Sequence, residues 1–169
     1  MKKFIATTVG ALVVAFALSG CITIQLPAGN GAGQSDPRTI TCEGSQVISE
    51  SGTYTLTERC PNLSIEANDV TLDADEVVNL DIQGDRVTVQ ASAVTTVVIG
   101  GNSNTVDILA LSDAQVAGDR NSVRTSGTLD RAVVNGNDNR IAADGGIAAT
   151  YDNGERTDFG TEVDPSEIG

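Results

Sequence analysis

The chain has no histidine and no tryptophan, and aromatic residues make up only 3% of its 169 residues. With three cysteines in all and no histidine, few side chains are suited to a zinc site. The scarcity of aromatics argues against a sugar-cleaving enzyme, because such clefts bind sugars against aromatic faces. Ten basic residues stand against 23 acidic ones, and this balance argues against binding to nucleic acid or to anionic lipid.

Helical periodicity is missing as well beyond the first 20 residues, and a short repeated phrase takes its place. The clearest copy reads G-N-S-N-T-V, from Gly101 to Val106. A fixed period of this length is the signature of a solenoid, in which each repeat stacks on its neighbours. The phrase begins, at successive spacings of 17, 17, 17 and 18 residues, at Ala67, Gly84, Gly101, Gly118 and Gly136.

Aligned at this period, the chain shows apolar columns that alternate with variable ones, which is typical of strands with one buried face. β-branched residues dominate these columns and favour strands over helices. The alignment predicts an all-β fold, a parallel β-solenoid (β-helix) of about six short coils, which we expect to be right-handed. The extra residue of the last spacing falls at 126–128. The clearest apolar columns are Leu63, Leu80, Val97, Ala114, Ala132; Ile65, Ile82, Ile99, Val116, Val134; and Leu72, Val89, Val106, Val123, Ile141.

The glycines and the Asn or Asp residues of the phrase are expected to form tight corners, where a positive φ must be tolerated. One inward column changes from valine to asparagine at Asn104, Asn121 and Asn139. Stacked asparagines can hydrogen-bond along the stack and to the corner backbone. We interpret these three residues as a structural ladder and not as a ligand site, because buried polar groups are normally satisfied by their neighbours.

The N-terminus matches a bacterial lipoprotein signal peptide. A basic start and an apolar stretch precede Leu18-Ser19-Gly20-Cys21, which fits the lipoprotein processing box. The match implies that residues 1–20 are removed and that Cys21 is lipidated, so that the exported protein is anchored by its lipid to the outer face of the cell membrane. Residues 21–41, rich in Gly and Pro, predict a flexible tether.

The other two cysteines, Cys42 and Cys60, are expected to form a disulfide in an exported chain. Their separation of 18 residues is one coil plus one residue, which brings them onto neighbouring coils within bridging distance. A metal site is the competing interpretation, weakened by the lack of histidine and of a third thiol in the fold. We expect the solenoid to cover residues 42–146, followed by an acidic cap or tail, 147–169, in which Phe159 or Tyr151 covers the last coil.

These features resemble an uncharacterised bacterial lipoprotein family, family 3060 of the domains of unknown function, found in exported proteins of high-GC Gram-positive species. Its pattern combines a cysteine, repeated G-x-x-N-x-V units and a second cysteine about one coil later. Gly101–Val106 is the closest match, Gly118–Val123 and Gly136–Ile141 follow it, and Gly84–Val89 lacks the Asn. The resemblance covers roughly residues 41–145. It implies a β-solenoid at the cell surface and brings no established activity and no catalytic residues.

Two sets of oxygen-bearing side chains are candidates for binding or chemistry. Asp73, Asp75, Glu76 and Asp81 offer the carboxylates that glycan binding or glycoside cleavage uses. The corner column offers oxygen ligands to calcium, although Asn and Asp are also good corner residues. That column consists of Asn68, Asp85, Asn102, Asp119 and Asn137.

The balance of these observations favours a non-catalytic, membrane-anchored lipoprotein that serves as a structural or interaction module of the cell envelope. Without its first 20 residues the chain loses both lysines, and its net charge changes from −13 to −15, which favours a soluble, self-repelling body. We expect a monomer without cofactor, with an envelope protein or a glycan as partner and no nucleic acid. The alternative is a glycan-binding or carbohydrate-active β-helix that uses surface carboxylates.

Overall fold

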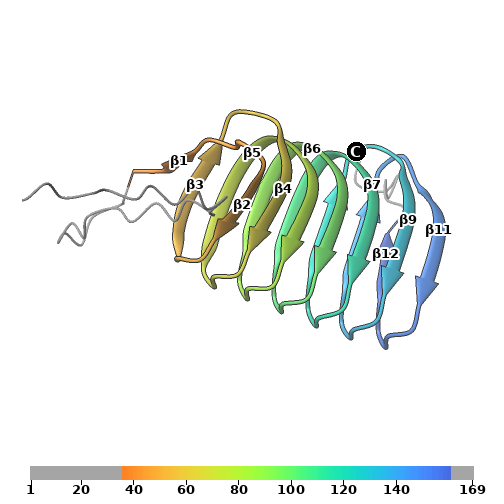
Figure 1. Ribbon diagram of the computed structural model, residues 1–169. Helices are drawn as coiled ribbons and strands as arrows, with labels where there is room; N and C mark the ends of the chain where they lie inside the picture. Colours follow the sequence, from red (N-terminus) through yellow and green to blue (C-terminus); the bar gives the residue numbers. More distant parts are fainter. Residues whose placement is uncertain (1–35, 161–169) are drawn as a thin grey trace, which may run out of the picture. The chain divides into compact units, whose positions relative to one another are not determined.

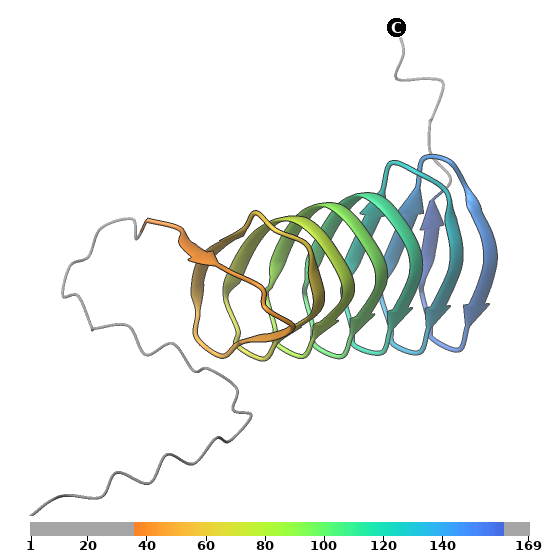
Figure 2. The same cartoon turned by 45° about the horizontal axis from the view of Figure 1, so that its top comes forward.

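The computed structural model describes residues 36–160, and this part of the chain contains strands and no helix. Every strand pairs in parallel with a strand one turn away along the chain. The result is a β-solenoid of about seven turns, whose coils follow one another in register (Figure 1, Figure 2). The predicted fold class is therefore confirmed, with about one coil more than expected, and the right-handed sense stays a prediction.

The strands lengthen toward the middle of the stack and shorten again toward its end. The N-terminal coils hold β1 (Arg38–Ile40), β2 (Ser45–Ile48), β3 (Gly52–Leu56) and β4 (Cys60–Ile65). The central coils hold β5 (Val70–Ile82), β6 (Thr88–Ile99) and β7 (Thr105–Val116). The C-terminal coils hold β8 (Ser122–Thr125), β9 (Leu129–Val134), β10 (Arg140–Ala143), β11 (Ile147–Asp152) and β12 (Asp158–Gly160).

The pairing register reproduces the sequence alignment. Val89 of β6 pairs with Leu72 of β5 and with Val106 of β7, each 17 residues away. β7 then pairs with two shorter strands, β8 and β9. Ile108 pairs with Thr125 at a spacing of 17, whereas Asp113 pairs with Arg131 at a spacing of 18. The extra residue therefore lies between these pairs, as the alignment predicts for 126–128.

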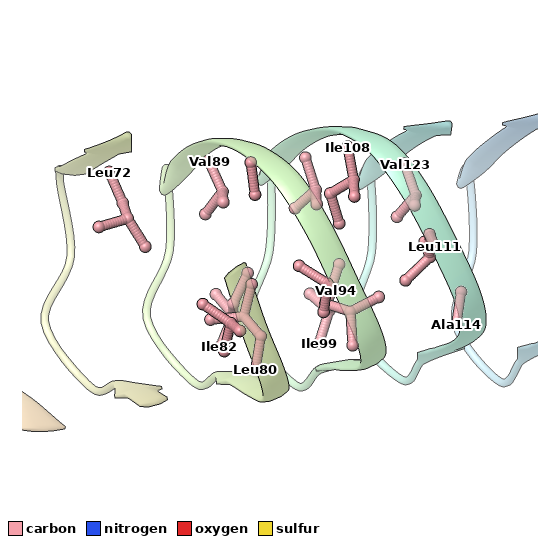
Figure 3. Close-up of a cluster of buried hydrophobic side chains, with 14 of the residues drawn as sticks. Leu72, Leu80, Ile82, Val89, Val94, Ile99, Ile108, Leu111, Ala114 and Val123 are labelled. Carbon is pink, nitrogen blue, oxygen red and sulfur yellow. The ribbon is translucent and has the colours of Figure 1, made fainter. Parts of the chain in front are cut away.

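The apolar columns form one continuous core along the stack. The side chains of all three columns are buried, and those of β5, β6 and β7 point into the interior from both walls (Figure 3). Burial of a Val, Leu or Ile side chain stabilises a fold by about 1.5–3 kcal/mol. Because each coil is too thin to bury these residues alone, this stabilisation depends on stacking against the neighbouring coils.

Each complete coil changes direction at two places, which we name the tight corner and the bend. The tight corner is the four-residue segment 83–86 between β5 and β6, with its equivalents 66–69, 100–103, 117–120, 135–138 and 153–156. The bend lies within the long strands, where two consecutive exposed residues, Asp75 and Glu76, separate the buried Ala74 and Val77. Its counterparts in the next coils are 91–94, 108–111, 125–129 and 143–147.

Both ends of the stack extend beyond the predicted limits of 42–146. At the start, β1 pairs with β3 and so places a strand before Cys42. At the end, Thr150 and Asp152 of β11 pair with the buried Ala132 and Val134 of β9. In β11, polar residues thus replace part of the apolar inward pattern, while Ile147 and Phe159 of the last coil still pack against the core. The polar groups close the core where water can solvate them.

The aromatic residues of this last coil lie in different environments. Phe159 pairs with Ile141 and packs against the core, whereas Tyr151 is 59% exposed. Of the two residues expected to cover the last coil, Phe159 therefore occupies the inward column.

Candidate functional site

The asparagines of the inward column are buried and hydrogen-bond from coil to coil. The Asn104 Oδ1 atom accepts the backbone N–H of Val87 at 2.7 Å. Asn121 and Asn139 repeat this contact one coil further on each, accepting the N–H of Asn104 at 2.9 Å and that of Asn121 at 2.8 Å. These amides satisfy buried backbone donors that no neighbouring strand reaches. We name this arrangement the inner ladder.

Two of the three amide nitrogens of the inner ladder are engaged as well. Asn121 Nδ2 donates to the carbonyl of Gly101 at 3.0 Å, and Asn139 Nδ2 donates to that of Gly118 at 2.9 Å. Among the buried side-chain nitrogens and oxygens of residues 36–160, only Asn104 Nδ2 has no hydrogen-bond partner. The ladder therefore holds the coils together and presents little to a ligand.

The corner column proposed for calcium forms a second file, the outer ladder, on the solvent side. In each step the side-chain Oδ1 of one coil accepts the backbone N–H of the residue at the same position in the next coil. The four steps from residue 68 to residue 137 measure 2.7, 2.7, 2.9 and 2.7 Å and join Asn68 to Asp85, Asp85 to Asn102, Asn102 to Asp119 and Asp119 to Asn137.

The outer ladder does not gather its carboxylates into one place. Asp85 and Asp119 are separated by a coil that carries Asn102 at the equivalent position. Within residues 36–160 no group of three His, Cys, Asp or Glu side chains is close enough to hold a metal ion. Each side-chain oxygen of this column that hydrogen-bonds to the next coil accepts a backbone N–H there.

The glycines of the tight corner do not have the role that the sequence suggested. The positive φ values, 56° to 57°, belong to the residue two positions later, among them Asp69, Arg86 and Ser103. A Cβ atom on Gly118 would lie 1.9 Å from the carbonyl oxygen of Gly101. Glycine is therefore required because consecutive corners approach too closely for a side chain. The expected positive φ is found at Asp69 and Asp138 of the phrase, and the expectation is wrong for the corner glycines.

The residues with positive φ carry a file of charges along the outside of the tight corners. Arg86 donates from Nε and Nη2 to both carboxylate oxygens of Asp69, at 2.7 and 2.8 Å. Arg156 binds Asp138 in the same bidentate manner. Hydrogen bonds from the two guanidinium groups lower the pKa of Asp69 and of Asp138. Sequence alignment did not reveal these pairs, although this position holds Asp or Arg at every tight corner but one, where it holds Ser103.

The carboxylates proposed for glycan chemistry lie on different parts of the coil. Asp73 is exposed on the strand before the bend, in register with Gln90. Asp75 and Glu76 lie at the bend itself, and Glu76 forms an exposed ion pair of 2.7 Å with Arg59. Asp81 accepts a hydrogen bond from Gln83 at the other end of the strand. The structure therefore places only Asp75 and Glu76 together.

A shallow groove of about 290 Å³ runs along the bends of consecutive coils. Glu76, Ala93 and Ala110 occupy the same position in three coils and line it in that order, with Thr128 in the next coil. Val94 and Leu111 also contribute to its lining. The groove arises because Ala93 and Ala110 are small, whereas a carboxylate side chain and the lengthened bend at 126–128 stand at its two ends. We name it the bend groove.

The disulfide belongs to the same bend. Cys42 and Cys60 are joined, with their Cα atoms 5.2 Å apart. Cys60 pairs in register with Val77, so it continues the buried column at the bend toward the N-terminus. The bridge therefore joins the first two coils, at the bend between β1 and β2 and at the bend between β3 and β4. Cys21, the proposed lipidation site, lies outside the described residues.

Comparison with known proteins found no matching family model, no curated relative and no solved structure. Within the described part of the chain, no helix is long and apolar enough to cross a membrane.

Proposed function

We propose that this chain is a non-catalytic lipoprotein of the cell envelope, anchored at Cys21, whose solenoid serves as a rigid structural or interaction module. The observation that carries the proposal is the use of the repeated polar residues. In both ladders the side-chain oxygens accept hydrogen bonds from backbone N–H groups of adjacent coils. This arrangement supports a body that resists deformation and meets its partners through the irregular outer positions.

Within this proposal, the bend groove is the part of the outer surface that binds the partner. It combines the small side chains Ala93 and Ala110 with one carboxylate, that of Glu76. A narrow apolar floor with a polar rim is the usual composition of an interaction site. The chain as a whole has a net charge of −13, which favours partners with basic groups.

A glycan-binding or carbohydrate-active role is the second candidate, and the groove is also the observation that favours it. Glu76, Thr95, Ser112 and Thr128 provide oxygens for sugar hydroxyl groups along a shallow channel. A hydrolase would need a second carboxylate opposite the first. Asp75, the neighbour of Glu76 in sequence, is the nearest candidate for that role.

Capture from an envelope extract tests the interaction module. The bait is the mature chain with Cys21→Ser, which removes the lipid and keeps the complete solenoid. The variant Ala110→Arg fills the groove, and Gln90→Arg adds the same side chain to an exposed position of β6 outside the groove. We expect a partner that Gln90→Arg retains and Ala110→Arg loses. Equal capture by both variants, or no capture by the parent, would count against the groove as the site.

The remaining elements of the proposal have separate tests. Labelling with a radioactive fatty acid should mark the parent protein in cells and leave Cys21→Ser unmarked.

Incubation with envelope polysaccharides should release no reducing ends from any substrate. Release that Glu76→Gln abolishes would replace the leading proposal with the carbohydrate-active one.

A further inference from the structure

Two tight corners contain the dipeptide Asn-Gly, at Asn135-Gly136 and at Asn153-Gly154. Both asparagines are exposed. Asparagine before glycine is chemically labile, because the backbone nitrogen of the next residue can attack the side-chain amide carbon. Glycine places no side chain in the way of this attack. The two corners are therefore candidate sites of spontaneous modification, and they differ in their surroundings.

The corner at Asn153 holds a base next to the attacking nitrogen. The backbone N–H of Gly154 donates to the Asp152 Oδ1 atom at 2.9 Å. Thr157 donates its hydroxyl to the same oxygen at 3.2 Å, which fixes the position of the carboxylate. The nitrogen must lose this proton to become a nucleophile, and a carboxylate that already accepts the hydrogen bond is placed to receive it.

Asn135 offers a matched comparison within the same molecule. The residue before it is Val134, which pairs in register with Asp152. A buried valine therefore stands where the last coil has its carboxylate. The two sites share the Asn-Gly sequence and the corner geometry, and even touch, since Asn153 Nδ2 donates to Asn135 Oδ1 at 2.9 Å. They differ because only the site at Asn153 has a carboxylate, that of Asp152, beside the attacking nitrogen.

Stacking differs as well. Each asparagine donates its backbone N–H to the earlier coil, Asn135 to Val116 and Asn153 to Val134, but in the described part of the chain only the corner of Asn135 also has a coil on its other side, that of 153–156. Within residues 36–160 the corner of Asn153 has a neighbouring coil on one side only, because β11 pairs with β9 alone and β12 with β10 alone. The backbone rotation that ring closure needs is less restrained there.

We propose that Asn153 is a self-modification site, at which Asp152 assists deamidation by the Gly154 nitrogen. The Gly154 nitrogen loses its proton to the Asp152 carboxylate and forms a bond to Asn153 Cγ. The Cγ–Nδ2 bond then breaks, and Nδ2 takes the proton back from Asp152 and leaves as ammonia. The product is a five-membered succinimide. Water then opens the ring at one of its two carbonyl carbons, which yields aspartate or isoaspartate at position 153.

The reaction changes how the last coil is held. The Asn153 amide donor to Asn135 is lost, and a negative charge appears beside Asp152 and Glu155. Isoaspartate also lengthens the main chain by one carbon at a corner where Gly154 has no room for a side chain, since a Cβ would lie 1.9 Å from the Gly136 oxygen. Deamidation therefore loosens the coil that closes the C-terminal end of the core.

Peptide mapping by mass spectrometry after ageing in mildly alkaline buffer tests the proposal on the full mature chain with Cys21→Ser. Asn153 should lose its amide faster than Asn135. The variant Asp152→Asn keeps an oxygen that can accept the Gly154 N–H but removes the base. It should slow the loss at Asn153 about tenfold, a modest effect for a positioned base, and leave Asn135 unchanged.

Asn135 also serves as the internal control for folding. If Asp152→Asn unfolded the last coil, the rate at Asn153 would match that of the urea-denatured protein, and if it unfolded the whole solenoid, the rate at Asn135 would do so as well. A loss at Asn153 that is no faster than at Asn135 would overturn the modification site. Equal rates at Asn153 in the parent and in a folded Asp152→Asn variant would overturn the role of Asp152.

Discussion

The tight corner and the bend occur in the same coils, but different interactions hold them together. At the tight corner, backbone approaches backbone closely, and two side-chain ladders satisfy the donors that the strands leave over. At the bend, apolar side chains such as Val77, Val94 and Leu111 fill the interior, and a disulfide secures the first coil. The tight corner therefore tolerates little change, whereas the bend varies in length and in its outer residues.

This contrast is sharpest for glycine. A Cβ on Gly118 at the tight corner would lie 1.9 Å from a backbone oxygen, whereas one on Gly127 at the bend would have its nearest neighbour at 3.5 Å. Gly118→Ala should lower the free energy of unfolding by more than about 3 kcal/mol, since overpacking against backbone finds no easy relief. Gly127→Ala should change it by about 0.5 kcal/mol or less. Urea denaturation of both variants measures the difference, and similar losses would contradict the distinction.

Removal of the disulfide tests how much this covalent link at the bend stabilises the protein. Replacing both cysteines, Cys42→Ser with Cys60→Ser, should cost about 3 kcal/mol, because the bridge restricts the unfolded chain over a loop of this length. Reduction of the parent protein should lower its melting temperature to that of the double variant. A reducing agent that lowers the midpoint of the double variant further would show that the staple is not the cause.

One buried polar residue can be replaced at each place, an inner-ladder asparagine next to the tight corner and a threonine at the bend, and the losses of stability compared. Asn121→Val leaves the backbone N–H of Asn104 without its acceptor and should destabilise the protein by about 2 kcal/mol. The matched variant at the bend is Thr125→Val. Thr125 is buried, but its hydroxyl makes only a long contact of 3.4 Å with the Leu109 carbonyl. Its loss should cost less than about 1 kcal/mol, so equal effects in urea denaturation would argue against the ladder.

The smallest effect concerns the charge file of the tight corner. The hydrogen bond from Arg86 lowers the pKa of Asp69 below its ordinary value of 3.8. A carboxylate with a lowered folded-state pKa adds stability above its unfolded pKa, and this stability is lost as the pH falls through the folded value. Arg86→Gln should return the NMR titration of Asp69 toward 3.8 and leave that of Asp138 unchanged. A midpoint unaffected by the variant would refute the pairing in solution.

The sequence predicted the regular part of the fold because the same physical demand recurs in every coil. Each inward column repeats an apolar residue, so a substitution such as Ala114 among valines and leucines does not hide the pattern. The last coil was misjudged because Thr150 and Asp152 break the pattern to close the core. The cause of the glycine repeat was also misread, since close backbone contact and positive φ leave the same trace in a sequence.

The candidate site was harder to predict than the fold. The bend groove depends on the small size of Ala93 and Ala110 relative to their neighbours along the stack, and a missing side chain gives no motif. The proximity of Asp75 and Glu76 was readable, but the pairing of Glu76 with Arg59 depends on a contact between different coils. Arg59 and Glu76 are one period of 17 residues apart, so the aligned register contained this pair, whereas the groove depends on side-chain packing that an alignment does not give.

The two ladders act in opposite directions, and this gives the stack a property beyond stability. The outer ladder reaches from each coil to the next, and the inner ladder reaches back to the previous one. The coil from Gly101 to Ala117 carries both kinds of residue, so a second copy of it would find the contacts that it offers itself. Duplication of those 17 residues would lengthen the body by one inter-strand distance, about 4.8 Å. The length of the solenoid can therefore change only in whole coils.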